Sequence, residues 1–241
     1  MNEIRPSVPI TALLLAILTL TGCAGARNPA DPLEPLNRGI YRFNDSVDKA
    51  VIKPVAQGYH AAVPLPVRVM AGNFISNLDD VLVTANDLLQ FKFNQAASDG
   101  ARVLFNSTFG VFGLFNVAAR LEKHNEDFGQ TLGYWGIGSG PYLVLPILGP
   151  SSLRDGTGLY VDGFASVPYN INHIPTRNQY YAVSGIHRRS TLLDQEKVLD
   201  EAVIDRYAFI RDTYLLHRKS LVADGNLPRA RYDGGEDDPA P

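Results

Sequence analysis

The residues that could do chemistry in this sequence do not form a catalytic pattern. Ser139 lies between Gly138 and Gly140, as the serine of a nucleophile elbow would. The elbow motif, Gly-x-Ser-x-Gly, requires a glycine at position 137, where this sequence has isoleucine. The glycines also fail as a dinucleotide-binding fingerprint, because Pro141 ends the run and no strand–helix unit surrounds it. We interpret this segment as a loop of tight turns.

Metal-binding and acid–base patterns are missing as well. Adjacent carboxylates such as Asp79 and Asp80 diverge by about 100° on a helix, which does not suit an acid–base pair. The histidines are scattered, with no pair four residues apart that could hold a metal on a helix: His60, His124, His173, His187 and His217. We expect a protein that is not an enzyme and that has no metal or cofactor.

Cys23 is the residue whose position indicates a specific modification. It is the only cysteine, and it follows Leu-Thr-Gly directly behind an apolar run from Val8 to Leu20. The run is shorter than the about 20 residues that cross a bilayer, and it has the layout of a cleavable signal peptide. The ending resembles a bacterial lipobox, whose cysteine is acylated after cleavage; the alternative is an accidental cysteine near an ordinary cleavage site. We predict a signal peptide over residues 1–22 and lipidation of Cys23.

Composition limits the partners and the domain organisation. The formal net charge is −3, which argues against a nucleic-acid partner. No later segment approaches about 18 continuous apolar residues, so we expect no transmembrane span. We predict a flexible tether over residues 23–34, one helical domain over residues 35–221 and a disordered acidic tail over residues 222–241.

Two amphipathic helices are expected early in the domain. Apolar residues at helical spacing predict a helix that starts at Leu36 and ends or kinks at Pro54. A longer helix over residues 64–90 has an apolar stripe and a parallel polar stripe, the latter made of Asn73, Asn77, Asp80, Thr84 and Asp87. This polar stripe suits solvent, a membrane interface, or a polar channel with lipid outside it. The sequence alone does not separate these three surroundings.

The rest of the domain combines helices with a segment rich in glycine and proline. A third helix is expected over residues 95–107, and residues 179–216 should be helical with an interruption only at Gly185. Between them, residues 127–163 are dense in glycine and proline, which predicts tight turns and no long regular element. The apolar segment 140–145 is either an ordinary core hairpin or a protruding, mobile loop. The fold is therefore predicted to be mainly α.

Three stretches of sequence carry a more specific signal. They begin at Asp31 (DPLEPLNR), Arg102 (RVLFNSTFG) and Phe128 (FGQTLGYWGIGSGPYLVLP), and the third continues from Leu148 as LGPSSLRD. Together they resemble the MlaA (VacJ) family of outer-membrane lipoproteins, over about residues 28–220. One departure is Asn116, where the family usually has aspartate; both residue types cap helices.

The resemblance implies a ring-like arrangement of amphipathic helices with a Gly/Pro-rich apolar hairpin loop. Members of this family sit in the inner, periplasmic leaflet of the outer membrane beside a trimeric porin. Their amphipathic channel removes mislocalised phospholipids from the outer leaflet and passes them to a soluble periplasmic carrier, MlaC. The hairpin beside the channel corresponds here to Gly140, Pro141, Tyr142, Leu143, Val144 and Leu145, and an early helix that influences channel opening corresponds to Tyr41, Arg42, Phe43 and Asn44.

Other functional classes remain open from the sequence. The main alternative is a structural or adhesion lipoprotein that scaffolds an outer-membrane complex without moving lipid. A lipase-like enzyme would have Ser139 as its only candidate nucleophile. Transfer of phospholipid by the purified protein would distinguish a transport lipoprotein from a structural or adhesion lipoprotein.

Overall fold

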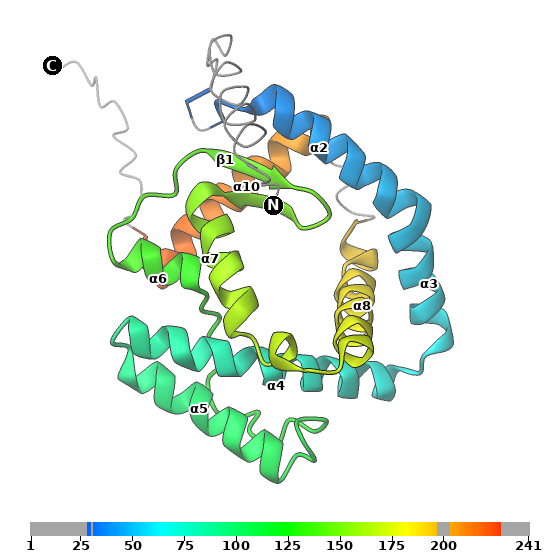
Figure 1. The fold of residues 1–241 in the computed structure, drawn as a ribbon, viewed down its shortest axis with the longest axis vertical. Helices are drawn as coiled ribbons and strands as arrows, with labels where there is room; N and C mark the ends of the chain where they lie inside the picture. The colour runs from blue at the N-terminus through cyan, green and yellow to red at the C-terminus, as the bar shows by residue number, and fades with distance from the viewer. Residues whose placement is uncertain (1–27, 30, 197–202, 228–241) are drawn as a thin grey trace, which may run out of the picture.

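The computed structural model describes residues 28–29, 31–196 and 203–227, which are mainly helical (Figure 1). Cys23 and the predicted signal peptide lie outside these residues, as does most of the predicted tail. In chain order the elements are α2 (Glu34–Val47), η2 (Asp48–Ile52), α3 (Lys53–Ala62), α4 (Leu65–Leu89), α5 (Phe93–Thr108), α6 (Phe128–Tyr134), β1 (Tyr142–Leu145), β2 (Gly149–Ser152), α7 (Leu153–Ala165), η3 (Pro168–Asn170), α8 (Ile174–Thr191) and α10 (Arg206–Val222).

The elements follow one another around a ring (Figure 1). One side is formed by α2, η2 and α3, the next by α4, and the opposite side by α6, α7 and α10, with the β-hairpin beside α2. Helix α8 packs on α3, whereas α5 lies outside the ring against α4. The prediction of a mainly α, ring-like fold is confirmed. Within the described residues, each helix is too short or too polar to cross a membrane.

The first helical stretch is interrupted next to its proline. Pro54 is the second residue of α3 and has no amide N–H, so the α-helical hydrogen bond back to Ala50 cannot form. The preceding turn, Asp48–Ile52, is widened into a π-helix, which absorbs this irregularity. The helix therefore does not end at Pro54: the chain stays helical from Glu34 to Ala62, and the proline is marked only by the π-helical turn that precedes it.

The Gly/Pro-rich region contains a regular helix that the sequence did not predict. Residues 153–165 form α7, so the expectation of no long regular element is wrong there. Gly158 explains the composition, because a Cβ at this position would overlap the backbone of Gly129 on α6. A glycine therefore permits two helices to approach closely instead of making a turn. Ser152 starts α7 by accepting the N–H of Asp155 at 3.1 Å.

The C-terminal third also differs from the expectation. Helix α8 continues through Gly185 and ends at Thr191, and residues 203–205 are not helical. The predicted single helix interrupted only at Gly185 is therefore wrong. Asp205 starts α10 by accepting the N–H of Ala208 at 3.1 Å, which explains the new start. Near the end of α8, both oxygens of Asp48 accept hydrogen bonds of 2.8 Å from Arg189, which joins α8 to η2.

The β-hairpin is a two-stranded antiparallel sheet. Tyr142 pairs with Ser152 and Leu145 with Gly149, which leaves residues 146–148 as the loop. This loop contains Ile147 with a φ of 65°, a left-handed conformation that is uncommon for a β-branched residue. Gly149 follows with a φ of 85°, where glycine is favoured.

Candidate functional site

Asn37 on α2 holds the first half of the hairpin. Its side-chain amide donates to the carbonyl of Tyr142 at 2.9 Å and to a carboxylate oxygen of Asp31 at 2.8 Å. Its amide oxygen accepts the backbone N–H of Val144, also at 2.9 Å. Asn37 is almost fully buried, so these bonds satisfy polar groups that have no access to water.

Asn44 repeats this pattern two helical turns further along. It donates to the carbonyl of Leu145 at 2.8 Å and accepts the N–H of Ile147 at 2.7 Å. Seven residues of α-helix rise about 10.5 Å, and three residues of β-strand extend about 10 Å, so the two spacings match. Asn37 therefore bonds the outer edge of β1 at Tyr142 and Val144, and Asn44 holds the end of the strand and the turn that follows it. We call these two residues the asparagine clip.

Tyrosines pack beneath the clipped strand. The ring of Tyr142 meets those of Tyr207 and Tyr214 edge to face, with centroids 6.3 and 6.0 Å apart, and Tyr41 meets Tyr207 at 5.7 Å. The Tyr207 hydroxyl donates to Asp31 at 2.5 Å. Burial raises the pKa of Tyr142 to about 12, and burial together with the bond to Asp31 raises the pKa of Tyr207. These phenols stay protonated at neutral pH.

Within segment 140–145, the structure favours the ordinary core hairpin over the protruding loop. Tyr142 and Val144 are buried in the core, which fits an ordinary core hairpin. The exposed apolar residues lie beyond this segment, at the tip, where Ile147 and Leu148 are 66% and 67% exposed. Leu143 lies between these extremes and is half-buried. The strand is therefore structural at its base and available for contacts at its tip.

The other predicted site residues divide in the same way. Tyr41 is half-buried against Tyr207, whereas Phe43 is exposed on α2. Gly140 adopts a φ of 66°, and the carbonyl of Pro141 accepts the first N–H of α7 at 3.1 Å. The structure thus brings Asn44 and segment 140–145 together and leaves Phe43 outside that contact. Their assignment to a channel or gate stays a prediction.

The polar stripe of α4 faces the protein interior. Asp80 is inaccessible and lies 3.5 Å from the guanidinium of Arg102 on α5, and it also pairs with Lys123. Asn77 donates to the hydroxyl of Ser107 at 2.9 Å. Asn77 and Asp80 therefore face neither solvent nor a channel, and both of these alternatives are wrong for them. Its central residues instead connect α4 to α5 and to the segment that follows α5.

Asp87, at the end of that stripe, is buried without a hydrogen-bond partner. Both carboxylate oxygens are inaccessible, and neither has a partner within the described residues. Burial raises its pKa to about 7, helped by the negative charges of Asp99 and Glu126. His124 and Lys92 act in the opposite direction. Asp87 is therefore partly protonated at neutral pH.

Large apolar side chains face outward instead. Apolar residues on the outside of α4, α5 and the loop after α5 are exposed, among them Val81, Leu88, Phe91, Phe93, Leu104, Phe105, Phe109, Phe112 and Phe115. A water-soluble protein seldom exposes so large an apolar surface. Polar groups that bond internally and apolar groups that face outward are what a lipid environment requires. The two faces of α4 thus have the polarity expected of a helix in contact with lipid.

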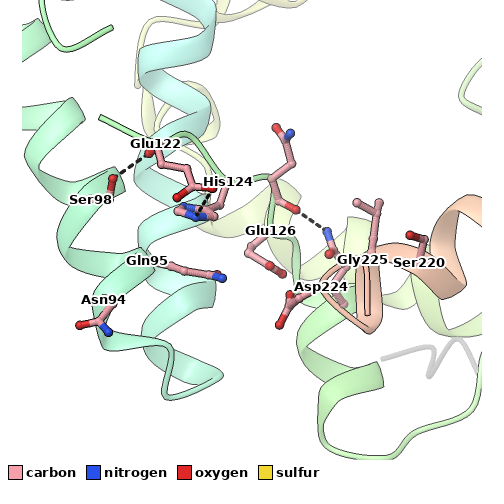
Figure 2. Close-up of a pocket in the computed structure, with 12 residues that line it drawn as sticks. Asn94, Gln95, Ser98, Glu122, His124, Glu126, Ser220, Asp224 and Gly225 are labelled. Atoms are coloured by element: carbon pink, nitrogen blue, oxygen red, sulfur yellow. Dashed lines mark hydrogen bonds and ion pairs between the residues drawn. The ribbon is translucent and has the colours of Figure 1, made fainter. Parts of the chain in front are cut away.

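A pocket of about 490 Å³, lined mainly by polar residues, lies between the start of α5, the segment that leads into α6 and the end of α10 (Figure 2). Ser98 donates to the carbonyl of Glu122 at 2.7 Å on one side of it, and Asp224 and Glu126 lie on the other. His124 pairs with the buried Asp99 at 2.6 Å. No group of three or more metal-ligating side chains occurs in the described part of the chain. The pocket therefore offers hydrogen bonds but not a metal centre.

Ser139 has no catalytic partner in this structure. Its hydroxyl is exposed and bonds the neighbouring carbonyl of Gly140 at 3.4 Å. Two of the described histidines, His60 and His187, bond Arg68 and Tyr59. Within the described residues, no histidine or carboxylate is hydrogen-bonded to Ser139. Nothing in the geometry of Ser139 favours a nucleophile.

The ring fold and the clipped hairpin can now be compared with known proteins. The sequence model of the MlaA lipoprotein family matches residues 29–221. The chain belongs to this family. A family lipoprotein of Escherichia coli K12, the intermembrane phospholipid transport system lipoprotein MlaA, is 35% identical over 90% of this chain and 89% of its own length. The protein of the same name from Haemophilus influenzae is 31% identical over 92% and 93%.

A solved structure supports the family assignment at the level of the fold. That structure describes the structural basis for maintenance of bacterial outer membrane lipid asymmetry. It aligns with a TM-score of 0.71 and 31% identity, covering 80% of this chain and 98% of its own. An uncharacterised family relative from Rickettsia bellii is 33% identical over 82% of this chain and 79% of its own length.

Sequence reasoning missed the residues that anchor the hairpin. Asp31 and Asn37 lie in the first family-like stretch, but their partners Tyr142 and Tyr207 are more than 100 positions away. The available signal was the spacing of Asn37 and Asn44, two polar residues on one helical face. Asp31 is buried although it falls in the predicted tether, and its partners include Arg211 on α10.

Proposed function

We propose that this protein is an outer-membrane lipoprotein that removes mislocalised phospholipids from the outer leaflet and maintains lipid asymmetry. Phospholipid would pass through an amphipathic channel enclosed by the ring of helices and then to a soluble, MlaC-like periplasmic carrier. The observation that carries the proposal is that α4 buries its polar side chains and exposes its apolar ones. It is made in a member of a family whose named relatives belong to a phospholipid transport system. No chemistry on the lipid is involved, so the protein is not an enzyme.

The proposed location follows from the same features. Lipidation of Cys23 would attach the protein to the periplasmic leaflet, and the exposed apolar faces of α4 and α5 would enter that leaflet from one side. Stable anchoring generally takes two signals, and acyl chains plus an apolar surface supply them. We propose a trimeric porin as the partner that holds the ring in place. A channel with a polar lining would spare a charged headgroup contact with hydrocarbon.

The hairpin is the proposed gate. Its base is fixed by Asn37 and the tyrosines, Asn44 restrains the backbone where the tip begins, and the side chains of Ile147 and Leu148 are exposed at the tip. An element with a fixed base and an exposed apolar tip can bend at the tip without loss of the fold. Gly140, Pro141, Tyr142, Leu143, Val144 and Leu145, with Tyr41, Phe43 and Asn44, are therefore the proposed channel or gating residues.

A deletion strain with complementation tests this function. We expect loss of the gene to raise the amount of phospholipid in the outer leaflet and to sensitise cells to detergent with chelator. The wild-type gene should restore both, and the Cys23→Ala variant should not, because it would be mislocalised. Unchanged surface phospholipid in the deletion strain would contradict the proposal. Purified protein that carries no phospholipid and supports no transfer to the carrier would instead favour a structural or adhesion lipoprotein.

A further inference from the structure

A groove on the outer side of the ring has the composition of a site for one acyl chain. It lies where α5 ends and the following segment folds back, and its volume is about 500 Å³, within the range of about 300–1,000 Å³ typical of small-molecule sites. Its lining residues are Phe105, Phe109, Val117, Ala118, Arg120 and Leu121. Five of these six are apolar, and Phe105 stacks on Phe109 with centroids 6.1 Å apart.

The walls of this groove are firmly positioned. Buried Arg102 donates to the carbonyls of Ala118 at 3.2 Å and Leu121 at 3.1 Å, which fixes the returning segment against α5. Asn106 accepts the N–H of Ala118 at 3.0 Å. The backbone on the returning side of the groove is therefore held by buried polar groups behind it.

The loop beside the groove exposes apolar side chains at a conformational cost. Val111 and Phe112 have φ angles of 51° and 57°, the left-handed region that bulky and β-branched residues avoid. Phe112 is nevertheless 76% exposed, so in water neither burial nor relaxed backbone geometry would offset this cost. Gly110 lets the loop close tightly, because a Cβ there would overlap the carbonyl of Phe115. In an apolar surrounding such as a membrane leaflet, contact with lipid would offset the cost of exposing Phe112 on this strained loop.

Arg120 supplies the charge that selects the occupant. It is the one charged residue lining the groove, it is exposed, and it forms no ion pair within the described residues. A guanidinium with its donors free, next to an apolar groove, complements an amphiphile with an anionic phosphate head. We propose that this groove binds one acyl chain of an anionic glycerophospholipid whose phosphate pairs with Arg120. This lipid is a retained ligand outside the ring and is distinct from the transported cargo.

Native mass spectrometry of the full-length, detergent-purified lipoprotein tests this site. Palmitoyl-oleoyl phosphatidylglycerol or phosphatidylcholine is supplied in micelles, and bound lipid is counted per protein. Arg120→Gln should lower bound phosphatidylglycerol about fivefold, the change that about 1 kcal/mol produces, and should abolish its preference over phosphatidylcholine. Phe109→Ala should lower both lipids. Matched controls are Arg177→Gln on α8 and Phe93→Ala, which is exposed on α5 but lies outside the groove.

Three results would overturn the proposal. Arg120→Gln could retain as much phosphatidylglycerol as Arg177→Gln, or Phe109→Ala as much lipid as Phe93→Ala. The groove variants could also lose co-purifying porin while their bound lipid stays constant, which would make the groove a protein interface. Surface phospholipid in cells is a separate readout: if transport fails in the deletion strain but the groove variants still transport, the two proposals are distinguished.

Discussion

Asn37 and Asn44 lie two helical turns apart on α2 and bond successive parts of the hairpin, Asn37 at Tyr142 and Val144 and Asn44 at Leu145 and Ile147. This relationship joins a helix from the start of the domain to a hairpin about 100 residues later. It also places the two bonds at different depths, since Asn37 is buried and Asn44 is half-buried. Asn37 therefore holds the base of the hairpin in the fold, whereas Asn44 restrains its tip.

The first prediction concerns this difference in depth. Asn44→Ala removes two partly exposed hydrogen bonds and should cost about 1 kcal/mol of unfolding free energy, whereas Asn37→Ala leaves buried groups unpaired and should cost about 3 kcal/mol. In Asn44→Ala, hydrogen exchange at the amide of Ile147 should accelerate and phospholipid transport should change. Ser46→Ala, on the exposed face of α2, is the control. Equal exchange at Ile147 in Asn44→Ala and Ser46→Ala would show that the clip does not restrain the tip.

The second prediction separates the base of the hairpin from its tip. Val144→Asp buries a charge without a partner and should unfold the domain or lower its abundance in cells. Leu148→Asp places the same charge on an exposed residue and should leave the melting temperature of purified protein nearly unchanged while it impairs transport. Leu143→Asp, at a half-buried position, should give an intermediate loss of stability. A destabilised Leu148→Asp would mean that the tip belongs to the core.

The third prediction uses two glycines of the same helix. Gly158→Ala would force α6 and α7 apart, because its Cβ overlaps the backbone of Gly129, and should destabilise the domain by about 3 kcal/mol. Gly163→Ala meets open space and should stabilise it by about 0.5–1 kcal/mol through helix propensity. Denaturant unfolding in detergent measures both values. If both substitutions change the free energy of unfolding in the same direction, close contact with α6 is not the reason for a glycine at position 158.

The fourth prediction concerns pH and Asp87. Its folded pKa of about 7 is above the ordinary value of 3.8, so the folded protein binds a proton in this window that the unfolded chain has released. Stability contributed by this site should therefore be highest below about pH 4 and should fall as the pH rises to about 7. Asp87→Asn keeps the shape and removes the titration.

The measurement is the difference in unfolding free energy between wild type and Asp87→Asn across that range. The variant should gain relative stability as the pH rises, with most of the gain present by pH 7 to 8. Comparison of the two proteins cancels the titration of more distant groups, while Asp99, Glu126, His124 and Lys92 surround Asp87 in both. A difference independent of pH would indicate that Asp87 is ionised throughout.

Periodicity determined the helices because it depends on neighbours in the chain. The stripes from Leu36 onward and over residues 64–90 predicted the start of α2 and both ends of α4 closely, and the π-helical turn before Pro54 accommodates its missing N–H. The glycines of residues 127–163 were harder, because glycine serves a turn and a close helix contact equally well. Only the approach of Gly129 shows which role Gly158 has.

The sequence by itself determined the amphipathic helices and the family resemblance, because each is recorded in local spacing or in a long motif; the same kind of local pattern predicts the signal peptide and the lipidation of Cys23. Only the tertiary structure decided which face of α4 points inward, since a polar stripe looks the same toward water and toward a partner helix. It also decided that Asn37 reaches Tyr142 and that Asp31 reaches Tyr207. Each of those contacts joins residues more than 100 positions apart, and they form only when the ring closes. A local sequence pattern does not show which distant segments will meet.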